Sequence, residues 1–177
     1  MRIRKGFTLI ELLVVIAIIG LIATISVVTL QYTRERARIA QARNSLKLLE
    51  KLYMAAQQEQ SAPIVNITLN GCTDCSCRTS TDMRNTTGPC YTDWETSLNR
   101  VKAAASGAIT AAPEVFLRDP WGSPYSLDEN EREFSPADCR PDTFRSLGPD
   151  GIYNTVDDIN LDGTAYLSPI PYSRPCP

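Results

Sequence analysis

The sequence of 177 residues contains no histidine. Histidine is the usual general base at neutral pH, so its absence removes the commonest partner of a serine or cysteine nucleophile. No spaced pair of catalytic carboxylates is identifiable either. Basic residues do not outnumber acidic ones, with 18 Lys and Arg against 20 Asp and Glu, and no basic face for nucleic acid is evident. We therefore expect neither an enzyme nor a nucleic-acid partner.

Ionic side chains are missing from residues 12–33, which follow a short basic start at residues 1–6. As a helix, this run would reach about 33 Å, which matches the hydrocarbon core of a bilayer. The basic residues before it should stay in the cytoplasm and place the rest of the chain outside. Two features oppose an ordinary secretory signal peptide, since the run is longer than a usual signal-peptide core and no A-x-A-like cleavage site precedes the polar sequence. Glu11 is costly in a simple anchor and requires a partner of opposite charge.

Glycine and proline are absent between Leu21 and Ser61, which predicts one long helix from about Thr8 to Gln60 that ends before Pro63. Its second half carries apolar residues at a spacing of three and four, which marks one helical face. We expect this face to pack on the chain's own sheet rather than to form a coiled coil, because the repeat is short. The apolar positions are Ile39, Ala42, Leu46, Leu49, Tyr53 and Ala56.

Six cysteines lie beyond the apolar run, on the exported side, where oxidation to disulfides is favoured. The sequence leaves their pairing open. The alternative is a zinc site at the first four, because thiolates at short spacing can surround a tetrahedral ion. We interpret residues 63–90 as a Cys-rich surface loop. The disulfide candidates are Cys72, Cys75, Cys77, Cys90, Cys139 and Cys176.

Short elements follow the Cys-rich loop. Residues 92–95, Thr-Asp-Trp-Glu, resemble a capping box and predict the start of a short helix that ends near residue 106. Plausible strands lie at residues 115–117, 123–127 and 143–147. Together with the long helix they predict an α+β fold, in which the helix lies across a small antiparallel sheet.

The segment Gly6-Phe7-Thr8-Leu9-Ile10-Glu11-Leu12-Leu13-Val14-Val15-Ile16-Ala17 resembles the signature of the type IV pilins and type II secretion pseudopilins. The resemblance implies that a membrane-embedded prepilin peptidase cuts after Gly6 and methylates Phe7. Residues 1–6 are then a leader peptide, residues 7–33 a transmembrane and filament-core helix, and residues 34–177 a pilin-like head. Glu11 is implied to pair with the N-terminal amine of a neighbouring subunit, as the electrostatics of a low-dielectric layer favour.

Asp119-Pro-Trp-Gly-Ser-Pro-Tyr125, together with residues 146–159, resembles the major pseudopilins of type II secretion systems. The resemblance implies a calcium loop over residues 146–163, with the Leu147 carbonyl and the carboxylates of Asp150, Asp157 and Asp158 as ligands. Such a loop can supply the hard oxygen ligands that calcium requires. Asn160 or Asp162 could add one, although Pro169 stands where an EF-hand would have its bidentate Glu. The alternative is a solvated turn without metal.

The leading hypothesis is a structural subunit of a type II secretion pseudopilus-like filament that supports protein secretion. Its partners are then copies of itself, prepilin peptidase, the inner-membrane assembly platform and minor pseudopilins. Before extraction into a filament it is a single-pass protein of the bacterial inner membrane, with its head outside the cytoplasm.

Three alternatives stay open. A bond between Cys139 and Cys176 would resemble the C-terminal disulfide loop of type IV pilins, so the first is a pilus pilin for motility, adhesion or DNA uptake. The second is a membrane-tethered binding module that never polymerises. The third is an exported hydrolase.

Overall fold

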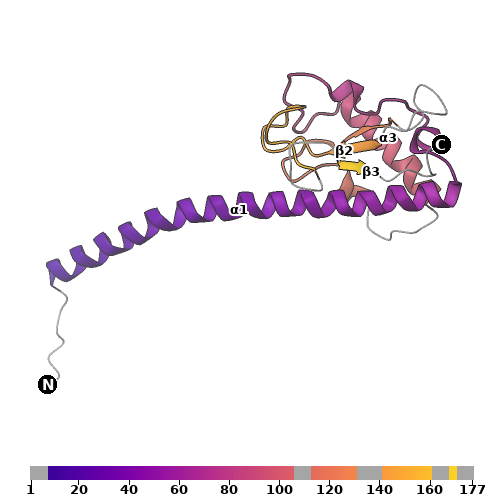
Figure 1. Ribbon diagram of the computed structural model, residues 1–177. Coiled ribbons are helices and arrows are strands. Elements are labelled where there is room, and N and C mark those ends of the chain that lie inside the picture. The colour runs from indigo at the N-terminus through magenta and orange to yellow at the C-terminus, as the bar shows by residue number, and fades with distance from the viewer. Residues whose placement is uncertain (1–7, 106–112, 131–140, 161–167, 171–177) are drawn as a thin grey trace. The chain divides into compact units, whose positions relative to one another are not determined.

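The computed structural model describes residues 8–105, 113–130, 141–160 and 168–170, without the side chains of residues 25–29, 113–114 and 168–170 (Figure 1). By its internal contacts the chain forms two compact units, Met1–Ala37 and Arg38–Pro177. The division falls in the charged stretch that follows the predicted membrane segment.

Helix α1 extends from Leu9 to Gln60, as predicted. In the first unit its large apolar side chains are exposed, with 81% of Leu9 and 59% of Ile22 accessible. Within the part of the chain that the structure describes, no helix has the length and apolarity needed to span a bilayer. The predicted span includes residues 25–29, whose side chains lie outside those described.

In the second unit, the apolar face of α1 forms one wall of the core. Ile39 is partly buried, and the other five predicted positions are completely buried. The Tyr53 ring lies 6.0 Å from the ring of Phe144 in the sheet, measured between centroids. The prediction that this face packs on the chain's own sheet is confirmed.

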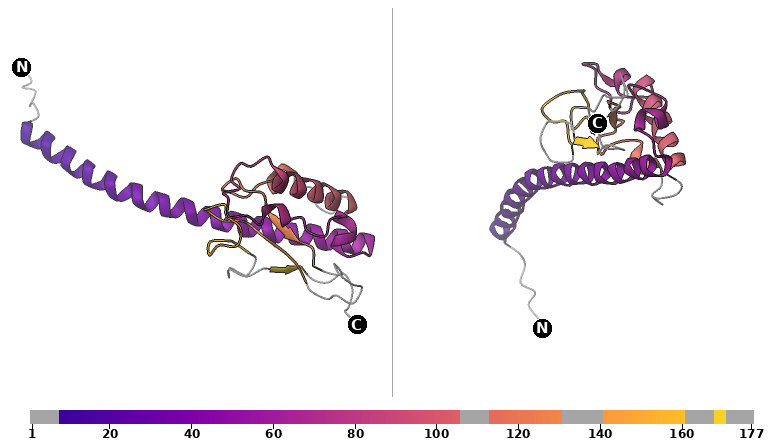
Figure 2. Two further views of the ribbon diagram at one scale, coloured as in Figure 1. Left: turned by 90° about the horizontal axis from the view of Figure 1, so that it is seen from above. Right: turned by 45° about the vertical axis from the view of Figure 1, so that its right-hand side comes forward.

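Over the described residues, the sheet has three antiparallel strands in the order β1 (Ser126–Asp128), β2 (Asp142–Arg145) and β3 (Ser168–Ile170). Successive side chains of a strand point to opposite faces. Phe144 therefore faces α1, and Arg145 faces the opposite side of the sheet. Figures 1 and 2 show the sheet and helix α3 on the same side of the second half of α1.

Helix α3 (Pro89–Ala104) starts earlier than the sequence predicts. The capping box proposed for Thr92 is wrong, because the Thr92 hydroxyl donates to the Pro89 carbonyl inside the helix, at 3.2 Å. Proline suits the first turn, since an N–H at that position would have no helical acceptor. Trp94 anchors the helix in the core, where its indole N–H donates to the Phe116 carbonyl at 2.8 Å.

Several smaller predictions need correction. Residues 115–117 are not a strand, because Pro113–Phe116 form a 3-10 helix, η2, whose Phe116 carbonyl is bonded to Trp94. The segment predicted as a loop contains helix α2 (Ile64–Thr68) and the 3-10 helix η1 (Cys75–Cys77). Strand β1 begins only after Pro124, which cannot donate to a ladder. The α+β class itself is confirmed.

Candidate functional site

The first candidate site lies at the start of α1, where Thr8 and Glu11 form a capping box. The Glu11 carboxylate accepts from the Thr8 backbone N–H at 2.8 Å and from the Thr8 hydroxyl at 2.7 Å. The Thr8 hydroxyl in turn lies 3.4 Å from the Glu11 backbone N–H. This reciprocal pattern satisfies backbone donors that a helix start leaves without partners. The predicted cleavage residues, Gly6 and Phe7, lie outside the described residues.

Two disulfides staple the segment before α3. Cys72 is bonded to Cys75, and Cys77 is bonded to Cys90. We call residues 72–90 the stapled segment. Cys72, Asp74 and Cys75 have side-chain ligand atoms within 4.8 Å of one another, but the disulfide leaves no thiolate there for the alternative zinc site. Cys139 and Cys176 lie outside the described residues.

The second candidate site is the acidic loop, residues 147–158. It is closed at its base by a β-bridge in which Ser146 and Ile159 exchange two backbone hydrogen bonds of 2.9 Å. Gly148 adopts a φ of +67°, and a Cβ built there would lie 2.2 Å from the Asp157 carbonyl oxygen. Only glycine allows this close approach of the two sides of the loop.

The three predicted carboxylates of the acidic loop surround one hydroxyl group. Oδ1 of Asp157 lies 2.5 Å from Oγ1 of Thr155, and the Oδ1 atoms of Asp150 and Asp158 each lie 3.3 Å from it. A hydroxyl carries a single proton, so it can donate to only one of these oxygens at a time. The other carboxylate oxygens are hard donors of the kind that calcium takes.

Backbone donors orient the same carboxylates. The Asp150 N–H donates to Oδ2 of Asp157 at 3.0 Å, and the Ile152 N–H donates to Oδ1 of Asp150 at 2.8 Å. Asn160, which the sequence offers as a further ligand, is buried, and its Oδ1 has no hydrogen-bond partner among the described residues. The side chain of Leu147, the predicted carbonyl ligand, is completely buried. Asp162 lies outside the described residues.

A buried ion pair joins the sheet to the acidic loop. Nη1 of Arg145 lies 3.0 Å from Oδ2 of Asp158, and these two side chains are only 7% and 3% exposed. The same oxygen accepts from the Asn154 N–H at 3.0 Å. Oδ2 of Asp158 is therefore bonded to Arg145 and Asn154, while Oδ1 faces the cluster around Thr155.

Asp119 links the two motifs of the pseudopilin resemblance. Its Oδ1 accepts from the N–H groups of Trp121 and Ser123, at 3.0 and 2.9 Å, and fixes the turn. Its Oδ2 accepts from the Ser146 hydroxyl at 2.6 Å, and the Ser146 oxygen accepts from the Gly148 N–H at 3.2 Å. Burial raises the pKa of Asp119 to about 6. The turn thus braces the base of the acidic loop.

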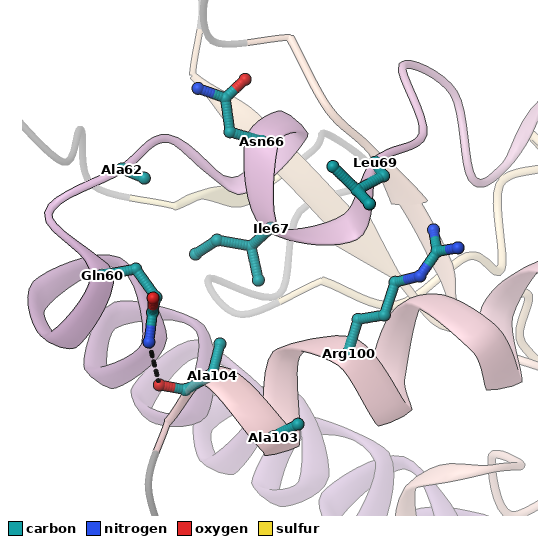
Figure 3. A pocket seen from close by; sticks show the side chains of 8 residues that line it. All are labelled: Gln60, Ala62, Asn66, Ile67, Leu69, Arg100, Ala103 and Ala104. Carbon is teal, nitrogen blue, oxygen red and sulfur yellow. Dashed lines mark hydrogen bonds between the residues drawn. The ribbon is translucent and has the colours of Figure 1, made fainter.

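A separate hollow of about 390 Å³ lies where the ends of α1 and α3 meet α2 (Figure 3). Two of its polar side chains are already bonded, since the Gln60 amide donates to the Ala104 carbonyl at 3.1 Å and the Arg100 guanidinium donates to the Thr68 carbonyl. Among the described residues, no acid or nucleophile lines it. The lining residues are Gln60, Ala62, Asn66, Ile67, Leu69, Arg100, Ala103 and Ala104.

Sequence reasoning missed two parts of these sites. The Thr-x-x-Glu spacing of Thr8 and Glu11 is a recognisable capping box and could have been found. The role of Arg145 had no local signal, because its partners lie elsewhere in the sequence.

Comparisons with known proteins match the N-terminal segment and, separately, most of the chain. Residues 1–27 match the family model described as the prokaryotic N-terminal methylation motif. The chain is 30% identical over 159 residues to type II secretion system core protein G of Dickeya chrysanthemi, which covers 89% of this chain and 86% of the relative. It is 29% identical over 166 residues to the protein of the same name from Klebsiella pneumoniae, covering 90% and 94% of the two chains. No solved structure matches significantly.

Proposed function

The chain belongs to the family of type II secretion system core protein G, and on this premise we propose that it is a subunit of a secretion pseudopilus, polymerised through its N-terminal helix. The observation that carries the proposal is the joint occurrence of the methylation motif at one end and relatives that cover most of the chain. These relatives favour the secretion filament over the type IV pilus. The role is structural rather than enzymatic.

Processing comes first in the proposed life of the subunit. Prepilin peptidase cuts between Gly6 and Phe7 and methylates the new terminus. The protein then waits in the bacterial inner membrane as a single-pass protein, with residues 7–33 in the bilayer and the head outside. The assembly platform and minor pseudopilins then act on it as it leaves for the filament.

Glu11 is the proposed assembly residue. The capping box supports this role, because it fixes the Glu11 carboxylate at the first turn of α1. The apolar side chains that follow are exposed in the single chain and need partners. In a filament they would be covered by neighbouring copies, and the terminal amine of one copy would pair with the Glu11 carboxylate of another.

Calcium is the proposed ion of the acidic loop. The residues that would hold it are Asp150, Asp157 and Asp158, with the Leu147 carbonyl and Asn160 as further oxygen donors. The cluster of carboxylate oxygens around the Thr155 hydroxyl supports this assignment. When bound, the ion would supply the positive charge that these carboxylates lack and would order the loop.

Assembly is tested by replacing Glu11 in cells that express the full secretion system. We expect Glu11→Gln to abolish filaments recovered by shearing while mature protein still accumulates in the membrane. Thr8→Val is the matched control, because it breaks the side-chain part of the capping box but keeps the Glu11 carboxylate, and it should still assemble. Normal filament yield from Glu11→Gln would refute the assembly role.

Mass spectrometry of sheared filaments tests the processing step in the same cells. The expected mass is that of a chain beginning at N-methylated Phe7 with its cysteines oxidised. An intact Met1 in assembled material would refute the proposal.

Calcium is tested on the full-length protein in detergent. Chelation should lower the melting temperature of the wild type by several degrees, since an ion that binds only the folded state stabilises it. Asp150→Ala should remove this dependence, whereas magnesium in place of calcium should not restore the higher value. An identical melting curve with and without chelator would refute the calcium assignment.

A further inference from the structure

The acidic loop contains three carboxylates but also faces one buried guanidinium. Arg145 reaches the loop because it lies on the face of β2 opposite to Phe144, which packs in the core. Its ion pair with Asp158 is almost completely shielded from water. A buried pair of this kind holds its geometry only when further hydrogen bonds satisfy both partners. The Asn154 N–H supplies one of these on the Asp158 side.

On the other side, the Arg145 guanidinium contacts Tyr153, and Tyr153 links it to the stapled segment. Nη2 of Arg145 lies 3.3 Å from the Tyr153 hydroxyl, and the guanidinium carbon lies 4.5 Å from the centre of the Tyr153 ring. The Tyr153 hydroxyl donates to Oδ2 of Asp74 at 2.9 Å. Asp74 is itself buried and forms an ion pair with Arg78 at 2.8 Å. The hydrogen bonds thus run from the stapled segment to the acidic loop.

Other contacts hold the opposite edge of the loop to the same segment. The Met83 N–H donates to the Gly151 carbonyl at 2.8 Å, and the Arg84 guanidinium donates to the Pro149 carbonyl at 3.0 Å. The Leu147 side chain belongs to the same buried cluster as Met83 and the disulfide between Cys77 and Cys90. The stapled segment and the acidic loop are therefore packed together as one structure.

We propose that Arg145 is a positioning residue for the acidic loop. Its guanidinium supplies a positive charge that fixes Asp158. The guanidinium is fixed in turn by Tyr153, whose hydroxyl is bonded to Asp74 of the stapled segment. The inference rests on the calcium site proposed above for its relation to metal. Its charge neutralises one of the three carboxylates. The two negative charges that remain would balance the double positive charge of one divalent cation, and Oδ1 is the oxygen that Asp158 could still offer to it.

This arrangement makes a specific statement about the loop without metal. Arg145 keeps the arm of the loop that carries Asp157 and Asp158 in place when calcium is absent, so calcium orders mainly the part that carries Asp150. A merely structural arginine would stabilise the whole head and would not act on the loop more than on α3.

The test is hydrogen exchange measured by mass spectrometry on the full-length protein in detergent, first in EDTA and then in calcium chloride. We expect Arg145→Met to speed amide exchange of the acidic loop in EDTA by about tenfold, as the loss of a charge-assisted hydrogen bond implies, with exchange in α3 unchanged. Calcium should restore part of the lost protection. Arg100→Met is the matched control, because that guanidinium is likewise hydrogen-bonded, but to the Thr68 carbonyl in the hollow beside α2. It should leave the loop unchanged.

Unaltered loop exchange in Arg145→Met in EDTA would overturn the proposal. If amide exchange in α3 also becomes faster in that variant, Tyr153→Phe decides, because it removes one hydroxyl, which contacts Arg145 and donates to Asp74, and keeps the ring beside the guanidinium. Faster exchange confined to the loop supports the proposal, and wild-type exchange overturns it. Tyr91→Phe is its control, since the Tyr91 hydroxyl donates to Glu95 away from the loop. A loop that never responds to calcium would refute the calcium site alone, since the EDTA comparison is independent of metal.

Discussion

Glu129 should make the stability of the head fall as the pH rises. Its side chain is completely buried, and the carboxylate accepts from the Thr73 N–H at 2.8 Å and from the Thr73 hydroxyl. Burial outweighs these hydrogen bonds and raises the pKa of Glu129 to about 7. An unfolded chain has an ordinary glutamate with a pKa of about 4.3.

The size and sign of the effect follow from these two pKa values. Between them the folded state keeps a proton that the unfolded state has released, so unfolding becomes easier as the pH rises. The contribution is fully present below pH 4 and is lost progressively toward the folded pKa of about 7. From about pH 4.5 to 7.5 the expected loss is roughly 3 kcal/mol of unfolding free energy.

Urea unfolding of the full-length protein in detergent and EDTA measures this dependence, with the fluorescence of buried Trp94 as the signal. Glu129→Gln should be the more stable protein at pH 7.5 and should lose most of its advantage by pH 4.5. A smaller slope of the same sign will remain, because the pKa of Asp119 is also raised, to about 6. Glu59→Gln, at an exposed position of α1, is the control. Parallel pH profiles for wild type and Glu129→Gln would refute the reasoning.

Three further changes test the head in thermal unfolding. Gly148→Ala should lower the unfolding free energy by about 1–3 kcal/mol, because the backbone is left-handed there and the new Cβ meets the Asp157 carbonyl. Gly88→Ala is the control, because its Cβ would make only an ordinary contact. Equal melting temperatures for the two variants would contradict this prediction. Replacing both Cys77 and Cys90 by Ser should lower the unfolding free energy by about 3 kcal/mol. The loss should exceed that from the same change at Cys72 and Cys75, because that disulfide closes a shorter loop. The reverse order would be evidence against the packing described for Leu147. Asp158→Asn should cost about 3 kcal/mol in EDTA because Arg145 loses its buried partner, and addition of Arg145→Met should recover part of it; strictly additive effects would rule out their coupling.

The long helix could be predicted from sequence because its signals are local. The repeated apolar spacing from Ala42 to Ala56 marks a buried face wherever that face packs, and the burial of Leu46, Leu49 and Tyr53 follows it. The predicted start of α3 was wrong, and the reason is also local. Thr92 and Glu95 have capping-box spacing, but Pro89 can begin the helix one turn earlier, and sequence alone does not rank the two.

In the candidate sites too, residues that are close in sequence could be predicted and contacts over long separations could not. Asp150, Asp157 and Asp158 are close in sequence, so a motif could group them. The contact between Tyr153 and Asp74 joins residues 79 positions apart, and the position of Arg145 depends on the register that pairs it with Ser126. Such contacts depend on how the chain closes over long separations, for which one sequence carries no direct signal.

The bridge between Ser146 and Ile159 has a consequence for how the loop can evolve. The chain enters and leaves the acidic loop at adjacent points, so a longer or shorter loop would not change where the sheet ends. Doubling the length of such a loop costs only about 0.6 kcal/mol in closure entropy. Val156, whose side chain is 95% exposed, can also vary, whereas residues beside the bridge are constrained from both the sheet and the stapled segment.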